Sequence, residues 1–463
     1  EILSGQPMYR NPQDFPYSIN LYTPVYFYLL SILVRLSKLN IYNDLHQILV
    51  LGRMLSFFII LLQLFYLAKL MRKFTASNFI IVVSITLYLL LISGHIYAVR
   101  PDALKILFFI VFVYYLLEYL FFSHQLKHAM LCIGAAVLGV YTKQDIAVHI
   151  TLYFFVAFIL LRRKKIILLF AIFIAGCLLG WFGIWLLYGK YIFYNLILFN
   201  LQSVKDILLS FNMIFIVFSI FRTFPLFIVV FLNLRKINSF GKELNAARFI
   251  VLISSILIPL TYLSLMRPGA NLNYTYELSI FLVLNLGLYI SFNLEKINQY
   301  KKIFYGLLVS YVIFLILTNA LIKNYDFDRS KEALNIKEYQ RCLSERGAIK
   351  QIIQNDTCFF PDTKYSIFYL EKPVVLGHDM HLDRFIKLYT NLDSIFYGLD
   401  IKTKLLYIDT KEYDDNFKNG RIKYIIIEHT SELMQHVAYF YPAYQPYKEV
   451  GNMLIYTFQN APK

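Results

Sequence analysis

The chain has 463 residues, of which 58% are hydrophobic and only 16% are charged, and its mean hydropathy is +0.56. Soluble domains carry about a quarter charged residues, so this composition excludes a single soluble domain and predicts an integral membrane protein. The formal net charge of +16 does not indicate a nucleic-acid partner, because polytopic membrane proteins retain Lys and Arg on their cytoplasmic loops.

Residues 1–48 differ from an ordinary membrane span, because Gly5 and several prolines interrupt them. The apolar stretch from Val25 to Leu36 is too short to cross a bilayer. We therefore expect an extracytoplasmic loop followed by a helix that lies along the membrane surface. Tyr22 and the tyrosines near it suit such an interfacial position.

Ten apolar runs follow, and they predict an α-helical polytopic protein with about ten spans between residues 49 and 322. The runs cover residues 49–70, 78–94, 103–122, 129–142, 147–161, 166–187, 207–232, 248–266, 275–292 and 303–322. Several reach the roughly 20 residues that a tilted helix needs to span the hydrocarbon layer. The runs 129–142 and 147–161 are shorter, and they predict either thin spans or helices broken around Thr142–Asp145.

The loops between these runs alternate in charge, which predicts the topology. One set is basic, and by the positive-inside rule it is cytoplasmic. It comprises the loops at 72–73, 127, 162–165, 235–248 and 296–302. Ten crossings then place both the N-terminal segment and everything after Lys323 outside.

The composition becomes polar and charged after Asn324, which predicts a domain boundary near 323–330 and an extracytoplasmic domain over 323–463. A helical pattern runs from about Ser330 to Asn355, and short β-branched or aromatic runs predict strands of a small α/β domain. These runs cover residues 357–360, 374–376, 405–408, 424–427 and 454–458. Cys342 and Cys358 can pair on the exported side, but two cysteines define no framework. The segment 377–383 holds two His and two Asp, and a polar loop is the favoured interpretation over a metal site.

The external motif Arg100-Pro101-Asp102 precedes the third run. In one interpretation Pro101 begins a helix and Asp102 has the sign that the helix dipole favours. In the other, Asp102 binds a divalent metal or orients a phosphate substrate, with Arg100 as an anion clamp. The motif Lys143-Gln144-Asp145 is similarly either a solvated turn or a means for Lys143 to reach a phosphate.

The external segment 267–277 (RPGANLNYTYE) is the densest polar stretch among the spans. It is either a Pro-Gly turn or a binding loop, because backbone N–H groups at a helix N-terminus bind anions and amide or phenol groups suit sugar hydroxyls. Its candidate residues are Arg267, Asn271, Asn273, Tyr274 and Glu277. Arg222, inside the run 207–232, either faces an anionic lipid or extends to the membrane surface.

Taken in order, four segments resemble the GT-C superfamily of polyprenyl-phosphate-sugar-dependent glycosyltransferases, in the branch of protein O-mannosyltransferases and lipid A aminoarabinose transferases. The segments are EILSGQPMYRNPQDFPYSINLYTP at 1–24, HIYAVRPDAL at 95–104, YTKQD at 141–145 and GANLNYTYE at 269–277. Arg53 resembles the Arg that opens the following span in this family.

The resemblance implies a sugar donor on a polyprenyl phosphate and transfer with inversion to a lipid, glycan or protein acceptor. It implies an integral protein of the bacterial cytoplasmic (inner) membrane that acts on the extracytoplasmic side. Asp102 corresponds to the acidic residue of the family's second external loop and is the candidate catalytic residue of this chain, with a divalent metal as an open alternative. It implies substrate binding by a further set of residues, namely Tyr22, Arg53, Arg100, Lys143, Arg267, Asn271, Asn273, Tyr274 and Glu277. The family's catalytic Asp, which usually belongs to an Asp-Glu pair, lies before the segment that matches Glu1 onward. We therefore expect a further helix before Glu1 and an inactive fragment without it.

Two other classes of function stay open. A polytopic transporter or lipid flippase would carry polar groups near the middle of the membrane, whereas the motifs here gather at one surface. An assembly subunit would bind a partner through its exported domain. The glycosyltransferase interpretation requires that the loops bearing Asp102, Lys143 and Glu277 converge at the non-cytoplasmic edge of the lipid.

Overall fold

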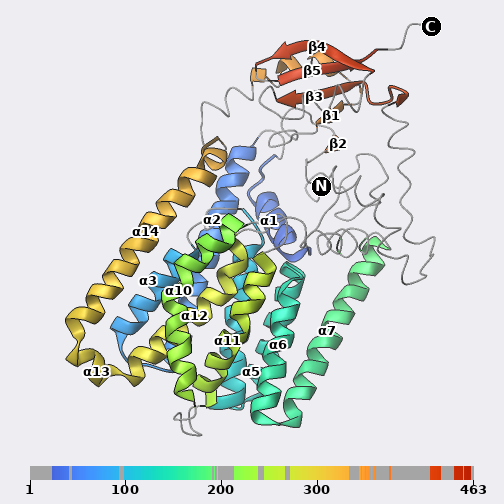
Figure 1. Cartoon of the computed structure of the whole chain (residues 1–463). Helices are drawn as coiled ribbons and strands as arrows, with labels where there is room; N and C mark the ends of the chain where they lie inside the picture. The colour runs from blue at the N-terminus through green and yellow to red at the C-terminus, as the bar shows by residue number, and fades with distance from the viewer. Residues whose placement is uncertain are drawn as a thin grey trace, which may run out of the picture.

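The structure is a computed structural model, and it contains a bundle of long helices with a small β-sheet at one end (Figure 1). It describes residues 23–40, 44–92, 99–189, 192, 196, 213–237, 245–265, 272–332, 344–345, 347–349, 351–354, 356, 358–360, 375–376, 418–428, 443–451 and 453–459. The segment 377–383, Cys342 and the expected strand at 405–408 lie outside these residues.

Each of the ten apolar runs forms a helix in the structure. The helices are α2 (Leu45–Met71), α3 (Asn78–Ile92), α4 (Asp102–Leu117), α5 (Leu126–Thr142), α6 (Ile146–Leu161), α7 (Lys164–Tyr188), α10 (Met213–Arg235), α11 (Asn245–Leu265), α12 (Tyr276–Phe292) and α14 (Lys301–Glu332). The turn η3 (Glu118–Phe122) continues α4, and the short helix α13 (Leu294–Gln299) precedes α14.

Six of these helices are long and apolar enough to cross a membrane, which is the character of an integral membrane protein. They are α2, α4 with η3, α7, α10, α11 and α14. The helices α3, α5, α6 and α12 have only 15 to 17 residues. The total of ten spans therefore stays a prediction.

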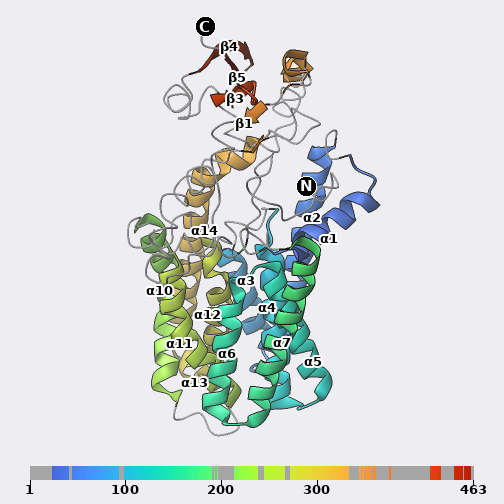
Figure 2. The same cartoon turned by 90° about the vertical axis from the view of Figure 1, so that its right-hand side faces the viewer.

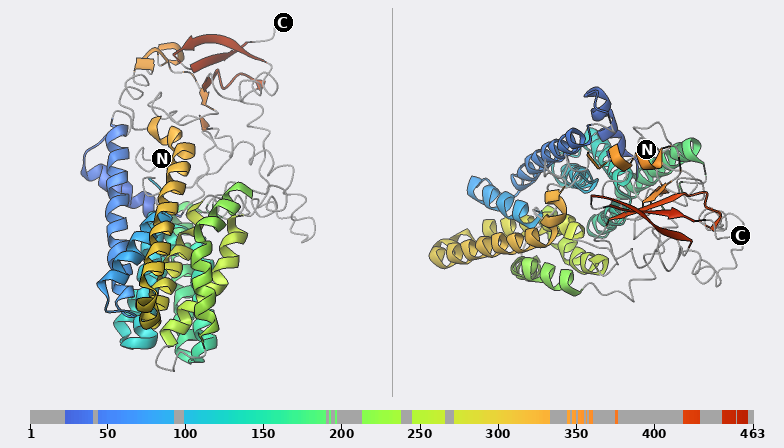
Figure 3. Two further views of the ribbon diagram at one scale, coloured as in Figure 1. Left: turned by 60° about the vertical axis from the view of Figure 1, so that its left-hand side comes forward. Right: turned by 90° about the horizontal axis from the view of Figure 1, so that it is seen from above.

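Helix α12 lies inside the bundle, because it is apolar around its whole circumference and must be covered by neighbours. It packs against α3, α10 and α11. The peripheral helices α7 and α14 instead leave most of their apolar side chains exposed, as lipid-facing helices do (Figure 2). Seen from above, α14 and α7 stand at opposite sides of the bundle (Figure 3).

The expected surface helix is α1 (Val25–Leu36), and it runs across the direction of the bundle helices at the end nearer the sheet (Figures 1 and 2). Thr23, just before it, donates a hydrogen bond to the carbonyl oxygen of Val140 at 3.0 Å. Tyr26 is buried against Ile59 of α2 and Leu104 of α4. Helix α1 is therefore fixed to the end of the bundle at which α4 begins and α5 ends.

The sheet has five strands in the order β2-β1-β3-β5-β4. The strands are β1 (Cys358–Phe360), β2 (Val375–Leu376), β3 (Tyr424–Glu428), β4 (Tyr444–Val450) and β5 (Met453–Phe458). Strand β1 is parallel to β2 and β3, whereas β5 is antiparallel to β3 and β4. The sequence did not predict β4, because this mostly exposed edge strand is polar and contains Pro446 beside a register shift.

Helix α14 continues to Glu332, which is beyond the apolar run that ends at residue 322. The residues after Lys323 include good helix formers such as Lys and Glu, so loss of hydrophobicity does not end the helix. The change in composition near residue 323 therefore does not mark the end of this helix.

Candidate functional site

Asp102 and Lys143 form a buried ion pair at the end of the bundle where α1 lies. Asp102 begins α4 directly after Pro101, whose backbone angles are already helical. Lys143 follows the last residue of α5, where the chain becomes extended. The Lys143 ammonium donates to Asp102 Oδ1 at 2.7 Å, and both side chains are 8% exposed. This pair connects the start of α4 with the end of α5.

Lys105 extends the pair into a network, since it lies one turn after Asp102 on α4. Its side chain is 1% exposed, and its Nζ lies 3.2 Å from Asp145 Oδ2 and 2.5 Å from Glu277 Oε1. Asp145 Oδ2 is also 3.7 Å from Lys143 Nζ. We call Asp102, Lys105, Lys143, Asp145 and Glu277 the charged cluster.

Glu277 is the most deeply placed carboxylate of the charged cluster. It lies in the first turn of α12, and its side chain is 1% exposed. Its contact with Lys105 is an ion pair by distance, but neither Glu277 oxygen has a hydrogen bond of good geometry within the described part of the chain. The imidazole Nδ1 of His149, 3.8 Å from Glu277 Oε1, has none there either.

Tyr274 borders the charged cluster from the turn η8 (Leu272–Thr275), which precedes α12. Lys143 Nζ lies 5.2 Å from the centre of the Tyr274 ring, a distance at which a cation is attracted to an aromatic face. The side chain of Lys143 therefore lies between a carboxylate and an aromatic ring.

The side chains of Lys143 and Asp145, in the turn between α5 and α6, are kept charged by the charged groups next to them. Burial lowers the pKa of Lys143, but the carboxylates of Asp145 and Asp102 outweigh it, so this pKa lies well above its usual range. Burial raises the pKa of Asp145, but the ammonium groups of Lys105 and Lys143 outweigh it, so this pKa lies below its usual range. Both side chains are therefore charged at neutral pH.

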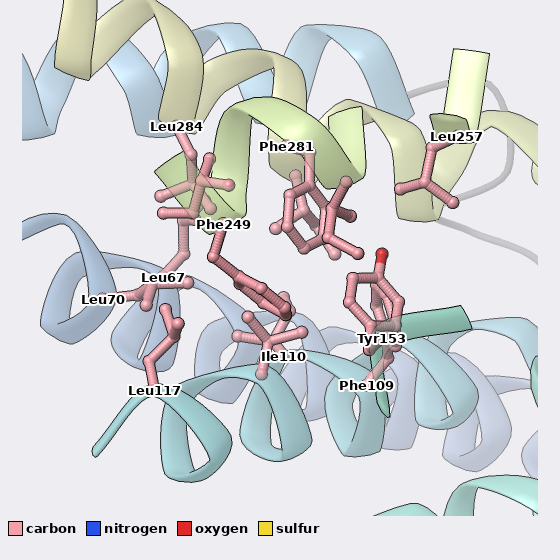
Figure 4. Close-up of a cluster of buried hydrophobic side chains, with 14 of the residues drawn as sticks. Leu67, Leu70, Phe109, Ile110, Leu117, Tyr153, Phe249, Leu257, Phe281 and Leu284 are labelled. Atoms are coloured by element: carbon pink, nitrogen blue, oxygen red, sulfur yellow. The ribbon is translucent and has the colours of Figure 1, made fainter. Parts of the chain in front are cut away.

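An aromatic layer closes the charged cluster on its bundle side. Three helices each carry an ionisable side chain with an aromatic one four residues later, namely Lys105 and Phe109 on α4, His149 and Tyr153 on α6, and Glu277 and Phe281 on α12. Residues four apart lie on one face of a helix. The Tyr153 ring centre is 5.4 Å from those of Phe109 and Phe281, and the three side chains lie together in Figure 4.

The structure therefore brings together Asp102, Lys143, Tyr274 and Glu277, four of the residues singled out from the sequence. Arg100 is exposed, and its charge lies near enough to act on the Asp102 carboxylate. The remaining candidates are less defined. Arg53 lies in α2, and no ion pair joins it to the charged cluster within the described ranges. Tyr22, Arg267 and Asn271 lie outside the described residues, and of Asn273 only its place in η8 is described.

Sequence reasoning missed Lys105 and His149, and it did not assign a role to Asp145. Both missed residues lie inside apolar runs that were treated as plain spans. A signal was present, since an ionisable residue within a membrane helix is expected to be functional or paired. Lys105 proves to be the centre of the charged cluster.

Arg222 lies in α10, and its contacts differ from both interpretations drawn from the sequence. Its Nη2 donates to the carbonyl oxygens of Leu90 and Leu91 at 2.9 and 3.2 Å and to Asn319 Oδ1 at 2.8 Å. The two carbonyls belong to the last turn of α3, which leaves such groups without helical partners. Arg222 thus caps α3 and joins it to α10 and α14.

The charged cluster does not provide a ready ligand set for a metal. Among the described residues, no group of three or more His, Cys, Asp or Glu side chains is placed to hold one ion. Asp102 has the Lys143 ammonium as its cation, and Lys105 separates the carboxylates of Asp145 and Glu277.

Comparisons with known proteins identify the fold. No protein-family model and no curated protein sequence matches the chain. Two crystal structures of ArnT from Cupriavidus metallidurans are similar, one bound to undecaprenyl phosphate with a TM-score of 0.55 and one in the apo state with a TM-score of 0.54. Each is 11% identical, over 96% of this chain and 89% of that chain. The chain therefore has the fold of ArnT, a lipid A aminoarabinose transferase of the GT-C class, as its sequence motifs predicted.

Proposed function

We propose that this protein is a membrane glycosyltransferase that takes a sugar from a polyprenyl-phosphate donor. The observation that carries the proposal is the buried pair of Asp102 and Lys143 at one end of an ArnT-like bundle. One of the ArnT structures holds undecaprenyl phosphate, which is the leaving group that such a donor releases. A cation next to a carboxylate is what transfer from a lipid phosphate requires.

In this proposal Lys143 binds the donor phosphate. A phosphate oxygen competes with Asp102 for the Lys143 ammonium and takes its place. Arg100, exposed two residues before Asp102, adds a second cation at the entrance. The ring of Tyr274 lies against Lys143 and is positioned to contact the sugar next to the phosphate.

Asp102 accepts a proton once the phosphate has displaced it from Lys143. The acceptor hydroxyl oxygen attacks the anomeric carbon as its proton moves to the Asp102 carboxylate. The bond between the anomeric carbon and the phosphate oxygen breaks, and its electron pair leaves on the lipid phosphate, where Lys143 stabilises the charge. A single displacement of this kind inverts the anomeric configuration.

The same proposal places the charged cluster at the extracytoplasmic edge of the membrane, with the region 323–463 on that side. The basic loops at 162–165 and 296–302 lie at the opposite end of the bundle, which agrees with the positive-inside rule (Figure 1). Helix α1 then lies at the membrane surface, where a polyprenyl chain would approach.

The test uses the full-length protein in vesicles with a polyprenyl-phosphate donor whose sugar is radiolabelled. We expect label to leave the lipid for an acceptor, with at least a hundredfold loss of rate in Asp102→Asn and Lys143→Met. Lys423→Met is the matched control, because Lys423 is an exposed lysine that pairs with Asp356 in the C-terminal sheet region. Label that stays on the lipid while crossing the membrane would instead identify a flippase. Equal transfer by wild type and Asp102→Asn would refute the assigned role of Asp102.

A further inference from the structure

Glu277 and His149 lie at the buried side of the charged cluster and take no direct part in the proposed transfer. Glu277 is buried below Lys105, and His149 is one turn after Asp145 on α6. The 3.8 Å between His149 Nδ1 and Glu277 Oε1 is just beyond hydrogen-bond distance. Both groups are without hydrogen bonds of good geometry among the described residues, although an unpaired buried polar group is costly.

The charges of the cluster do not cancel. Asp102, Asp145 and Glu277 supply three carboxylates, whereas Lys105 and Lys143 supply two ammonium groups, so the charged cluster carries one excess negative charge. The exposed Arg100 guanidinium also acts on Asp102, but Glu277 shares Lys105 with Asp145. A buried charge that is only partly compensated is costly in a low-dielectric interior. A phosphate donor would add a further negative charge to the same place.

His149 is the group that can compensate, because imidazole is the side chain that ordinarily gains a proton between pH 5 and 8. It faces Glu277 of α12, Lys105 of α4 and Asp145, and the ring of Phe109 lies 6.3 Å from its own. A protonated Nδ1 would donate to Glu277 after a shift of about 1 Å. That one proton would give both groups the hydrogen bond that they lack among the described residues.

Other ionisable groups near the pair are phenols or lie at a distance. Tyr153 follows His149 by one turn, and Tyr88 of α3 faces Glu277, but phenols stay neutral in this pH range. Helices α7 and α11 also pack against α6. Their only charged residues lie in their first turns, Lys164 and Lys165 in α7 and Arg248 in α11, away from the charged cluster.

We propose that Glu277 and His149 are positioning residues that take up a proton when the anionic donor binds to Lys143. Glu277 holds Lys105 between the carboxylates, and His149 gains the proton that offsets the charge of the phosphate. This inference rests on the proposed function, and it makes donor affinity pH-dependent through a group that does not touch the donor. The complex binds more protons than the free protein, so affinity rises as the pH falls.

The test measures binding of a short-chain polyprenyl methyl phosphodiester to the full chain in lipid nanodiscs between pH 5.5 and 8. This probe keeps one negative charge over the whole range, so any pH dependence belongs to the protein. Calorimetry in two buffers that differ in ionisation enthalpy counts the protons taken up. For wild type we expect uptake of up to one proton and a Kd that rises by up to about tenfold per pH unit.

Two variants and a control complete the design. We expect His149→Gln to bind the probe with no proton uptake, and Glu277→Gln to bind it with little pH dependence, because the excess negative charge is gone. His128→Gln is the matched control, since His128 pairs with Ser123 in the first turn of α5, about 20 Å along that helix from Lys143. It should keep the wild-type slope.

The outcomes separate this inference from the proposed function. Probe binding by wild type without proton uptake, or a slope that survives in His149→Gln, would overturn the inference and leave the function standing. A wild-type protein that binds no probe at any pH would remove the proposed function itself, and the inference with it.

Discussion

Lys105 and Glu277 are joined within the bundle, with the Lys105 ammonium 2.5 Å from Glu277 Oε1 and each side chain 1% exposed. Their relationship is unequal, because Lys105 also reaches Asp145, whereas Lys105 is the only lysine or arginine that pairs with Glu277 among the described residues. Loss of the Lys105 ammonium therefore leaves Glu277 without a lysine or arginine partner among the described residues, whereas loss of the Glu277 carboxylate leaves Lys105 paired with Asp145.

The first prediction follows from this difference in the number of partners of Lys105 and Glu277. Lys105→Met should lower the free energy of unfolding by about 3–5 kcal/mol, because it leaves Glu277 buried without a cation. Glu277→Gln should cost less, since Lys105 keeps Asp145. The double variant Lys105→Met, Glu277→Gln should lose less free energy of unfolding than the two single variants lose together. Chemical unfolding in detergent micelles measures these free energies. Lys423→Met, at an exposed pair, should change stability by less than about 1 kcal/mol. Equal costs for the two single variants would contradict this asymmetry.

A second prediction separates stability from chemistry at the Asp102–Lys143 pair. Lys143→Met should destabilise the protein by about 3 kcal/mol or more, because it removes the ammonium that faces the buried Asp102 carboxylate. Adding Asp102→Asn should restore most of that stability, since the remaining groups are neutral. It should not restore donor binding or transfer, because the phosphate still has no ammonium. A double variant that regains transfer would mean that the pair is purely structural.

The third prediction concerns pH and the side chain of Asp145. Its pKa is lower in the folded protein than in the unfolded chain, so its stabilising effect is complete above the unfolded pKa and is lost as the pH falls through the folded one. The difference in melting temperature between wild type and Asp145→Asn should stay constant from about pH 5 to 9 and shrink below about pH 4. A difference that grows on acidification would contradict this sign.

The same reasoning with opposite sign applies to Lys143. Its pKa is raised in the folded protein, so its stabilising effect is complete below about 10.5 and is lost only as the pH rises through the folded value. Neither Asp145 nor Lys143 changes charge between about pH 5 and 9. A change in donor affinity within that range therefore comes from another group, and the loss of that change in His149→Gln would identify His149.

A fourth prediction assigns Arg222 to the fold. Arg222→Leu should cost about 3 kcal/mol, because it removes the donor to two carbonyl oxygens of α3 and to Asn319. The variant that remains folded should keep the wild-type KM for the polyprenyl donor. Arg235→Leu, at the exposed end of α10, is the matched control and should be neutral. Normal stability with a raised KM would instead support contact between Arg222 and an anionic lipid.

Much of the fold was predictable, because each bilayer-length apolar run specifies a helix by itself. The run at 275–292 predicts α12 almost to the residue. Strand β4 was not predictable in this way, since its exposed edge position removes the alternating apolar pattern. The ten-span topology also placed the motifs with Asp102, Lys143 and Glu277 on one side, and the coordinates bring these side chains into one cluster.

The positions of Lys105, His149 and Glu277 were not predictable, because they depend on the orientation of α4, α6 and α12 about their own axes. In the sequence, Lys105 is a single charged residue within an apolar run. The residues around it do not indicate that it pairs with Asp145 and Glu277. His149 likewise reads as a single polar residue in α6. Pairing across 172 positions of sequence, from Lys105 to Glu277, is set by packing alone.

The last prediction tests the aromatic layer beneath the charged cluster. Phe281 is fully buried and stacks on Tyr153 with an angle of 27° between the rings, four residues after Glu277. Phe281→Ala should lower the free energy of unfolding by about 3 kcal/mol or more through the cavity that it leaves. It should also slow transfer, because the carboxylate of Glu277 and the ammonium of Lys105 lose the surface that holds them in place.

The control for this layer is Phe221→Ala, which removes an exposed ring from α10 and should change neither property. Phe281→Leu should recover most of the stability, since it refills much of the volume. The informative quantity is the number of protons that the protein takes up when it binds the probe. Water that enters beneath Glu277 would screen its charge and so make protonation of His149 less favourable. Phe281→Ala should therefore bind the phosphodiester with a weaker pH dependence than wild type. An unchanged pH dependence in a destabilised Phe281→Ala would mean that the layer supports the fold without insulating the charges above it.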